Sequence, residues 1–89
     1  MKLQGKSAII TGGGRGLGRS IALAMSREGA MVTIMSRSLD QLRGVARQIN
    51  GDGKQCAVYQ GDVSRPEDVS GMVEQTVKRF SRVDVLVNN

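Results

Sequence analysis

Residues 7–18, SAIITGGGRGLG, carry the strongest structural signal in this sequence. The first five are a short apolar run of the kind that forms a buried strand. The glycines that follow let the backbone turn sharply and approach a ligand closely. Apolar residues then recur at helical spacing from Leu17 to Met25, and Gly29 supplies a stop signal. The segment therefore predicts a strand, a glycine-rich turn and a helix.

Three further strands are expected, alternating with two further helices. The strands are residues 31–35, 55–60 and 85–87, each of them short and apolar. Alternation of this kind is typical of a parallel sheet with helices on both faces. Right-handed crossovers would place the strands in the order 3-2-1-4. The expected fold is a doubly wound α/β unit, βαβαβαβ, over residues 1–89.

Capping boxes mark the expected starts of the second and third helices. Ser38 pairs with Gln41 before the second helix, and Ser64 pairs with Glu67 before the third. Pro66 is acceptable in a first helical turn. The third helix has the clearest helical stripe of the chain: Val69, Met72, Val73, Thr76, Val77 and Phe80.

The composition is that of an ordinary globular protein and excludes several classes of site. Hydrophobic residues make up 39% and charged residues 24%. The net charge is +5, but the basic residues are scattered and no aromatic platform is present, so nucleic-acid binding is not expected. One cysteine and no histidine argue against a disulfide framework, a zinc site and a His-based triad. No signal peptide or bilayer-spanning run is visible, which favours a reducing, cytoplasmic setting without a membrane partner.

The glycine-rich turn is a candidate phosphate site. A helix that follows such a turn offers free N–H groups and the positive end of its dipole, both of which suit a pyrophosphate. The common fingerprint GxGxxG fits in no register. The pattern TGxxxGxG does fit, through Thr11, Gly12, Gly16 and Gly18.

A second phosphate motif overlaps the first. Residues 13–20, GGRGLGRS, match the P-loop pattern GxxxxGK[ST], except that Arg19 replaces the lysine. That lysine reaches the β- and γ-phosphates and is central to P-loop chemistry. A P-loop-type phosphate binder is therefore the less favoured alternative.

The TGxxxGxG turn resembles that of the short-chain dehydrogenase/reductase family, which has a Rossmann-type fold. The resemblance continues through the chain. Asp62-Val63 matches the acidic pair that the family places near the adenine ring, and Asn88-Asn89 matches the start of its NNAG motif. All three motifs follow strands, at the sheet edge where open α/β folds bind ligands. The sequence looks closest to the 3-oxoacyl-[acyl-carrier-protein] reductase and sugar dehydrogenase branch.

The resemblance implies an NAD(P)-dependent oxidoreductase that acts on a small-molecule carbonyl or alcohol and forms a homotetramer when full length. Residues 1–89 would be its NADP-binding half, truncated before the catalytic Ser, YxxxK and further Asn of the family. No catalytic residue is expected here, because Val63 rather than lysine stands four positions after Tyr59, and Cys56 looks like a strand residue. The chain alone is expected to be inactive. A non-catalytic nucleotide-binding fragment is the alternative.

Basic residues favour NADP(H) over NAD(H) as the cofactor. An NAD-type site has a carboxylate at the end of the second strand, where this chain has Ser36-Arg37-Ser38. Arg37 suits a 2′-phosphate, and Arg15 is a second basic residue that the family uses in this way. Two charge-assisted hydrogen bonds of about 1.5–3 kcal/mol each would favour NADP on the order of 100-fold. The expected cofactor-binding residues are Gly12, Gly14, Arg15, Gly16, Leu17, Gly18, Ser36, Arg37, Ser38, Asp62, Val63, Asn88 and Asn89.

Overall fold

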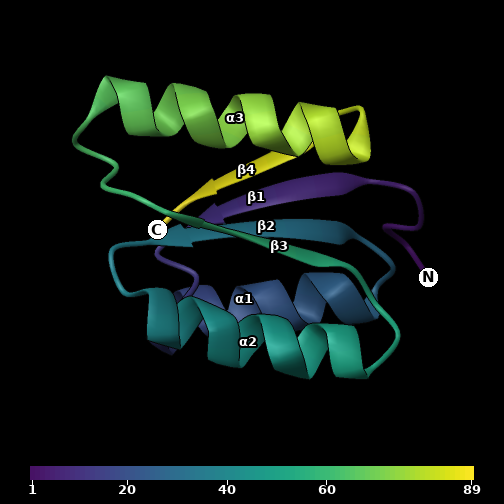
Figure 1. Cartoon of the computed structure of the whole chain (residues 1–89). Helices are drawn as coiled ribbons and strands as arrows, with labels where there is room; N and C mark the ends of the chain where they lie inside the picture. Colours follow the sequence, from purple (N-terminus) through teal and green to yellow (C-terminus); the bar gives the residue numbers. More distant parts are fainter.

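The computed structural model describes all 89 residues and contains seven alternating elements (Figure 1). They are β1 (Ser7–Thr11), α1 (Gly16–Arg27), β2 (Met31–Ser36), α2 (Leu39–Gly51), β3 (Cys56–Gln60), α3 (Pro66–Phe80) and β4 (Val85–Asn88). Every strand pair is parallel, and the order across the sheet is β3-β2-β1-β4. The predicted α/β fold and its strand order are confirmed. No helix is both long and apolar enough to cross a membrane.

Helices cover both faces of the sheet, with α1 and α2 on one face and α3 on the other (Figure 1). Side chains of a strand alternate between the faces, so Ile10 of β1 joins the larger core of ten buried residues beside α1 and α2. Its neighbour Ile9 packs with Met35 and Met72 in a smaller core under α3. Burying one such side chain contributes about 1.5–3 kcal/mol. The two central strands, β1 and β2, are thus fixed from both sides.

The start of α3 differs from the sequence prediction. The capping box expected at Ser64 does not form, because Arg65 is the N-cap residue and no side chain caps the helix. Ser64 instead donates its backbone N–H and its hydroxyl to Oδ1 of Asp62, at 2.9 and 2.7 Å. Oδ2 of Asp68 accepts the backbone N–H of Asp62 at 2.9 Å. Ser64 therefore hydrogen-bonds to the Asp62 carboxylate and does not cap α3, which is the role that the sequence pattern had predicted for it.

The apolar stripe of α3 is only partly buried. Met72, Thr76 and Phe80 are buried and recur every four residues. Val73 and Val77 lie one position further round the helix and are 38% and 45% exposed. The buried face of α3 is therefore narrower than the sequence stripe indicates.

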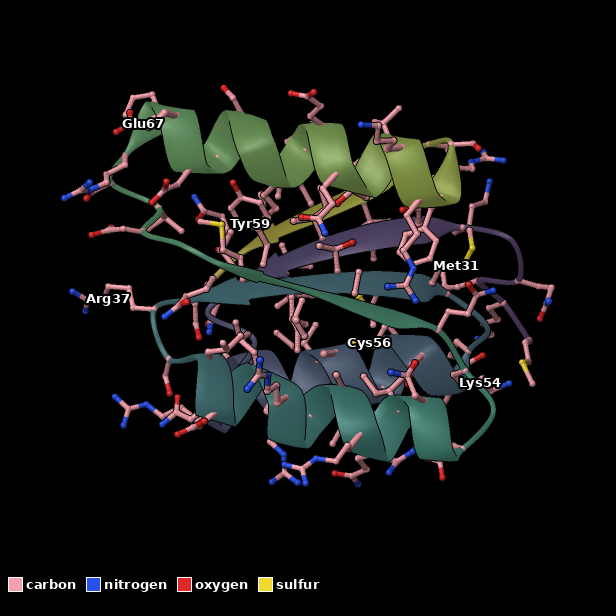
Figure 2. The ribbon with its side chains drawn as sticks, in the orientation of Figure 1. Met31, Arg37, Lys54, Cys56, Tyr59 and Glu67 are labelled. Atoms are coloured by element: carbon pink, nitrogen blue, oxygen red, sulfur yellow. The ribbon has the colours of Figure 1, made fainter.

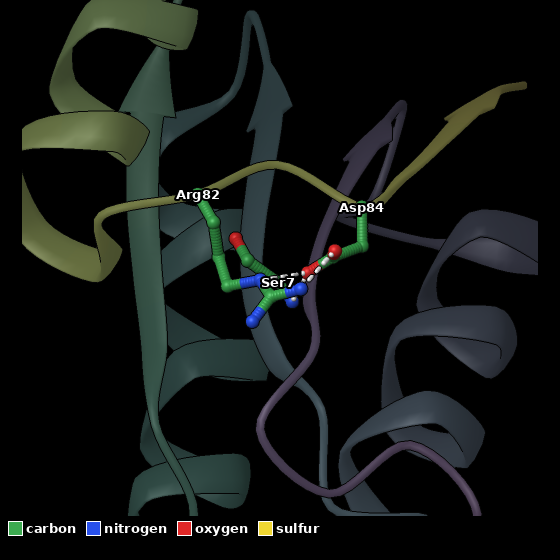
Figure 3. Close-up of polar contacts among 3 residues, drawn as sticks. All are labelled: Ser7, Arg82 and Asp84. Carbon is green, nitrogen blue, oxygen red and sulfur yellow. Dashed lines mark hydrogen bonds and ion pairs between the residues drawn. The ribbon is translucent and has the colours of Figure 1, made fainter.

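Asp84 ties the starts of β1 and β4 together (Figure 3). Its Oδ2 accepts the backbone N–H of Ser7 at 2.9 Å, and its own N–H donates to the Ser7 carbonyl at 2.8 Å. The Arg82 guanidinium lies 2.7 Å from the same carboxylate. The hydrogen bond from Arg82, followed by that from Ser7, holds the pKa of Asp84 below its usual value of 3.8.

Asp84→Asn should make the free energy of unfolding depend less steeply on pH under acidic conditions. The lowered pKa means that the Asp84 carboxylate stabilises the fold above its unfolded-state pKa, and that this contribution is lost as the pH falls through the lower folded-state pKa. The variant has no charge to titrate. The check is the free energy of unfolding of the protein between about pH 2 and pH 6. If the slope matched that of the unsubstituted protein, Asp84 would not contribute to the acid sensitivity.

Candidate functional site

A cleft of about 820 Å³ opens at the C-terminal ends of the strands. Sequence-predicted residues that line it are Gly12, Gly14, Arg15, Gly16, Leu17, Ser36, Arg37, Ser38, Asp62, Val63 and Asn89. Gly18 and Asn88 do not line it. Met35, Gln41, Gly61 and Ser64 do, although the motifs did not single them out as site residues. The three motifs, far apart in the sequence, thus meet at one edge of the sheet.

The glycine-rich turn shapes one wall of the cleft. Gly12 and Gly16 have φ angles of +70° and +60°, in the left-handed region that favours glycine. The N–H of Gly12 donates to the Met35 carbonyl at 2.7 Å, which fixes the turn to β2. Helix α1 begins at Gly16 without an acidic residue in its first turn. Its positive dipole end and free N–H groups therefore face the cleft without a competing carboxylate.

Close packing explains two other glycines of the turn, Gly14 and Gly18. A Cβ on Gly18 would collide with the backbone carbonyl oxygen of Gly12, so α1 can approach the turn only because residue 18 has no side chain. A Cβ on Gly14 would lie 3.0 Å from the Gln41 Cβ and 3.2 Å from the Ser36 hydroxyl. The backbone of the turn is left accessible, and a helix N-terminus stands behind it. These residues fit the diphosphate of a dinucleotide.

Thr11 joins the turn to the end of β4. Its hydroxyl lies 3.3 Å from the Val87 carbonyl and 3.1 Å from Oδ1 of Asn88, and it accepts the N–H of Asn89 at 3.1 Å. Nδ2 of Asn89 lies 3.5 Å from the Gly12 carbonyl. The Asn88 side chain is thus directed at β1 rather than into the cleft. Of the two asparagines, Asn89 is the one that lines the cleft.

Two arginines supply the positive charge of the cleft. Both Arg15 and Arg37 line it and are exposed, and Arg37 extends outward beyond the end of β2 (Figure 2). The residues that end β2 and lead into α2 include no carboxylate before Asp40. The two guanidinium groups can therefore pair with an anion bound in the cleft.

Asp62 is the acidic group of the cleft. The backbone N–H and hydroxyl of Ser64 hold the pKa of Asp62 below its usual value of 3.8, and the charges of Arg37 and Arg65 act in the same direction. Asp62 is therefore ionised at neutral pH. Its carboxylate can accept hydrogen bonds from a base or from a sugar hydroxyl.

Arg19 does not take part in the cleft. Its Nη2 donates to Oε1 of Gln48 on α2 at 2.8 Å, and the residue is absent from the cleft lining. The position that a P-loop fills with its phosphate-binding lysine therefore holds a side chain that links α1 to α2. The geometry does not favour P-loop chemistry.

Cys56 and Tyr59 are residues of β3, as the sequence predicted (Figure 2). Cys56 belongs to the larger core, where burial raises the pKa of its thiol to about 12. A thiol of this kind stays protonated and is a poor nucleophile. Tyr59 packs against the smaller core, with its hydroxyl over Gly71 of α3. Neither side chain lines the cleft.

Comparisons with known proteins agree with this geometry. A family model described as short chain dehydrogenase matches residues 6–89. An uncharacterized oxidoreductase of Mycobacterium tuberculosis is 43% identical over 88 residues, which cover 99% of this chain and 34% of that protein. A 3-oxoacyl-[acyl-carrier-protein] reductase of Staphylococcus epidermidis is 40% identical over 85 residues, covering 94% and 35%. The chain spans about a third of the length of these curated relatives.

Solved structures resemble the whole chain. L-Sorbose reductase from Gluconobacter frateurii, complexed with NADPH and L-sorbose, has a TM-score of 0.93 and 36% identity, over 100% of this chain and 35% of that one. A metagenomic short-chain oxidoreductase in complex with NADP has a TM-score of 0.92 and 32% identity, over 100% and 40%. Both of these similar proteins were solved in complex with NADP or NADPH.

Proposed function

This chain belongs to the short-chain dehydrogenase family, and from that premise we propose that it is the NADP(H)-binding part of an oxidoreductase. The reaction is hydride transfer between the nicotinamide and a small-molecule carbonyl or alcohol. The nicotinamide ring supplies or accepts the hydride when the cofactor is bound. The residues of this chain bind and orient the nucleotide.

The choice of NADP(H) rests on one observation, the charge at the end of β2. Arg37 follows the strand directly, no carboxylate ends it, and Arg15 of the glycine-rich turn lines the same cleft. A carboxylate would accept the ribose 2′-hydroxyl of NAD, whereas a guanidinium pairs with the 2′-phosphate of NADP. Ser36 and Ser38 add hydroxyl groups beside the same position.

The remaining residues of the proposed site bind different parts of the dinucleotide. The turn from Gly12 to Gly18 holds the pyrophosphate through its backbone N–H groups and the start of α1. Asp62 and Val63, which also line the cleft, border the adenine ring. Thr11 and Asn88 position Asn89 just after the end of β4.

Residues 1–89 form, in this proposal, the cofactor-binding half of a longer domain. Strand β4 is an edge strand, and its Leu86 is 63% exposed, as is expected of a strand that another segment covers. The curated relatives are about three times as long. The catalytic acid–base residues and the surfaces of a homotetramer would belong to the remainder of the full-length protein.

Competitive binding to the full-length protein tests the proposal. Titration with NADPH, NADH and ATP should give the tightest dissociation constant for NADPH, on the order of 100-fold below that for NADH. Mixing with NADPH and a panel of carbonyl compounds should oxidise the cofactor. Tighter binding of ATP than of NADPH would refute the dinucleotide site. NADPH binding without turnover of any carbonyl or alcohol would instead favour the non-catalytic nucleotide-binding alternative.

A further inference from the structure

Gln41 lines the same cleft as the two arginines, although its sequence pattern marks it only as a helix-capping residue. Its Cβ lies 3.0 Å, and its Oε1 3.3 Å, from the point where a Cβ of Gly14 would stand. The Ser36 hydroxyl lies 3.2 Å from the same point. The Gln41 side chain and the Ser36 hydroxyl therefore both lie close to Gly14 of the glycine-rich turn.

The local hydrogen bonds leave the Gln41 amide free. Ser38 Oγ accepts the Gln41 backbone N–H at 3.4 Å, which is one half of the predicted capping box. The reciprocal half does not form, because the Ser38 N–H donates to Ser36 Oγ at 3.3 Å. The Gln41 side-chain amide makes no hydrogen bond within the chain, so its Nε2 can donate to a ligand.

We propose that Gln41 is a specificity-determining residue that recognises the ribose 2′-phosphate. This inference rests on the proposed NADP(H) site. A phosphate held by Arg15 and Arg37 presents several acceptor oxygens, and a primary amide supplies two further donors without adding charge. The Gly14 backbone leaves the space in which the amide lies.

Two substitutions at Gln41 test this role in the full-length protein. Gln41→Met keeps the length of the side chain and removes the donors, and it should weaken NADPH binding by about three- to tenfold. Gln41→Glu adds a charge that repels the phosphate, and it should weaken NADPH binding by at least about tenfold. The NADH dissociation constant should stay within about threefold in both variants, because NADH has no 2′-phosphate. Glutamate at this position also fits the capping-box pattern, so helix α2 should remain intact.

Gln48→Glu is the matched control, since it makes the same change on the same helix at a residue outside the cleft. It should leave the ratio of NADPH to NADH affinity unchanged. The proposal is overturned if the Gln41 variants weaken both dinucleotides equally, or if Gln41→Met has no effect on NADPH. Failure of the unsubstituted protein to bind NADPH would be a different result, because it would refute the proposed function itself.

Discussion

Arg37→Asp should lower the ratio of NADPH to NADH affinity by about 100-fold or more. The substitution removes a guanidinium that lines the cleft and puts a carboxylate where an NAD-type site has one. Two effects then act together, since the carboxylate repels the 2′-phosphate and accepts the 2′-hydroxyl of NADH. The measurement is the dissociation constant of each dinucleotide for the full-length protein. We expect NADPH to bind more weakly and NADH more tightly than before.

Arg43→Asp provides the control for the change in total charge. Arg43 is exposed on α2 and does not line the cleft, yet its substitution alters the net charge equally. The dinucleotide ratio should stay within about threefold, because the charge is largely screened in salt. An unchanged ratio in Arg37→Asp, or an equal drop in both variants, would remove the basis for assigning NADP(H).

Gly18→Ala should reduce the affinity for both dinucleotides by more than about 100-fold. The added Cβ collides with the Gly12 carbonyl oxygen, which is a backbone atom and cannot move without the turn. Either α1 or the turn must shift, and the N–H groups that face the pyrophosphate shift with them. Overpacking of this kind also costs about 1–3 kcal/mol of stability. Binding titrations and thermal unfolding of the full-length protein measure the two effects.

Gly44→Ala separates this steric effect from the general effect of a glycine substitution. Gly44 lies within α2, and a Cβ there would meet no atom within 4 Å. Alanine is the better helix former, so this variant should be more stable by roughly 0.5–1 kcal/mol and should bind NADPH normally. Wild-type NADPH affinity in Gly18→Ala would show that the close approach of α1 to the turn is not required for binding.

The fold could be predicted from the sequence because local patterns and global topology agree in this chain. Short apolar runs alternate with segments whose apolar residues recur at helical spacing, and this alternation predicts a parallel sheet. The right-handedness of the crossovers then predicts the order of the strands. The start of α3 could not be predicted in the same way. Ser64 and Glu67 satisfy the capping pattern, but the carboxylate of Asp62 is close enough to bind both donors of Ser64. Such competition between local side chains depends on geometry that spacing does not specify.

The candidate site was predictable where a motif follows a strand, as at Gly12, Arg37 and Asp62. The sequence did not identify Gln41 as a site residue, because the capping pattern already explains a glutamine at that position. Its place in the cleft becomes visible only in the folded structure, where α2 packs against the glycine-rich turn. Asn88 is the opposite case, a residue that the sequence assigned to the site and that does not line the cleft. It belongs to a recognisable motif, yet its side chain reaches the Thr11 hydroxyl rather than the cleft. Asn88 is the last residue of β4 and pairs with Thr11 in the sheet, whereas Asn89 follows the strand and lines the cleft.

The two ties between β1 and β4 also have a consequence for the order in which the protein forms. Asp84 binds Ser7 across 77 residues, and Asn89 binds Thr11 across 78. During synthesis, β1 leaves the ribosome first but must wait for residues 84–89 before either contact can close. Long-range parallel pairing is slow, because the entropy of a long loop is lost before the contacts form. Strand β1 would therefore spend the early part of translation with one edge open, a state in which other chains or a chaperone can reach it.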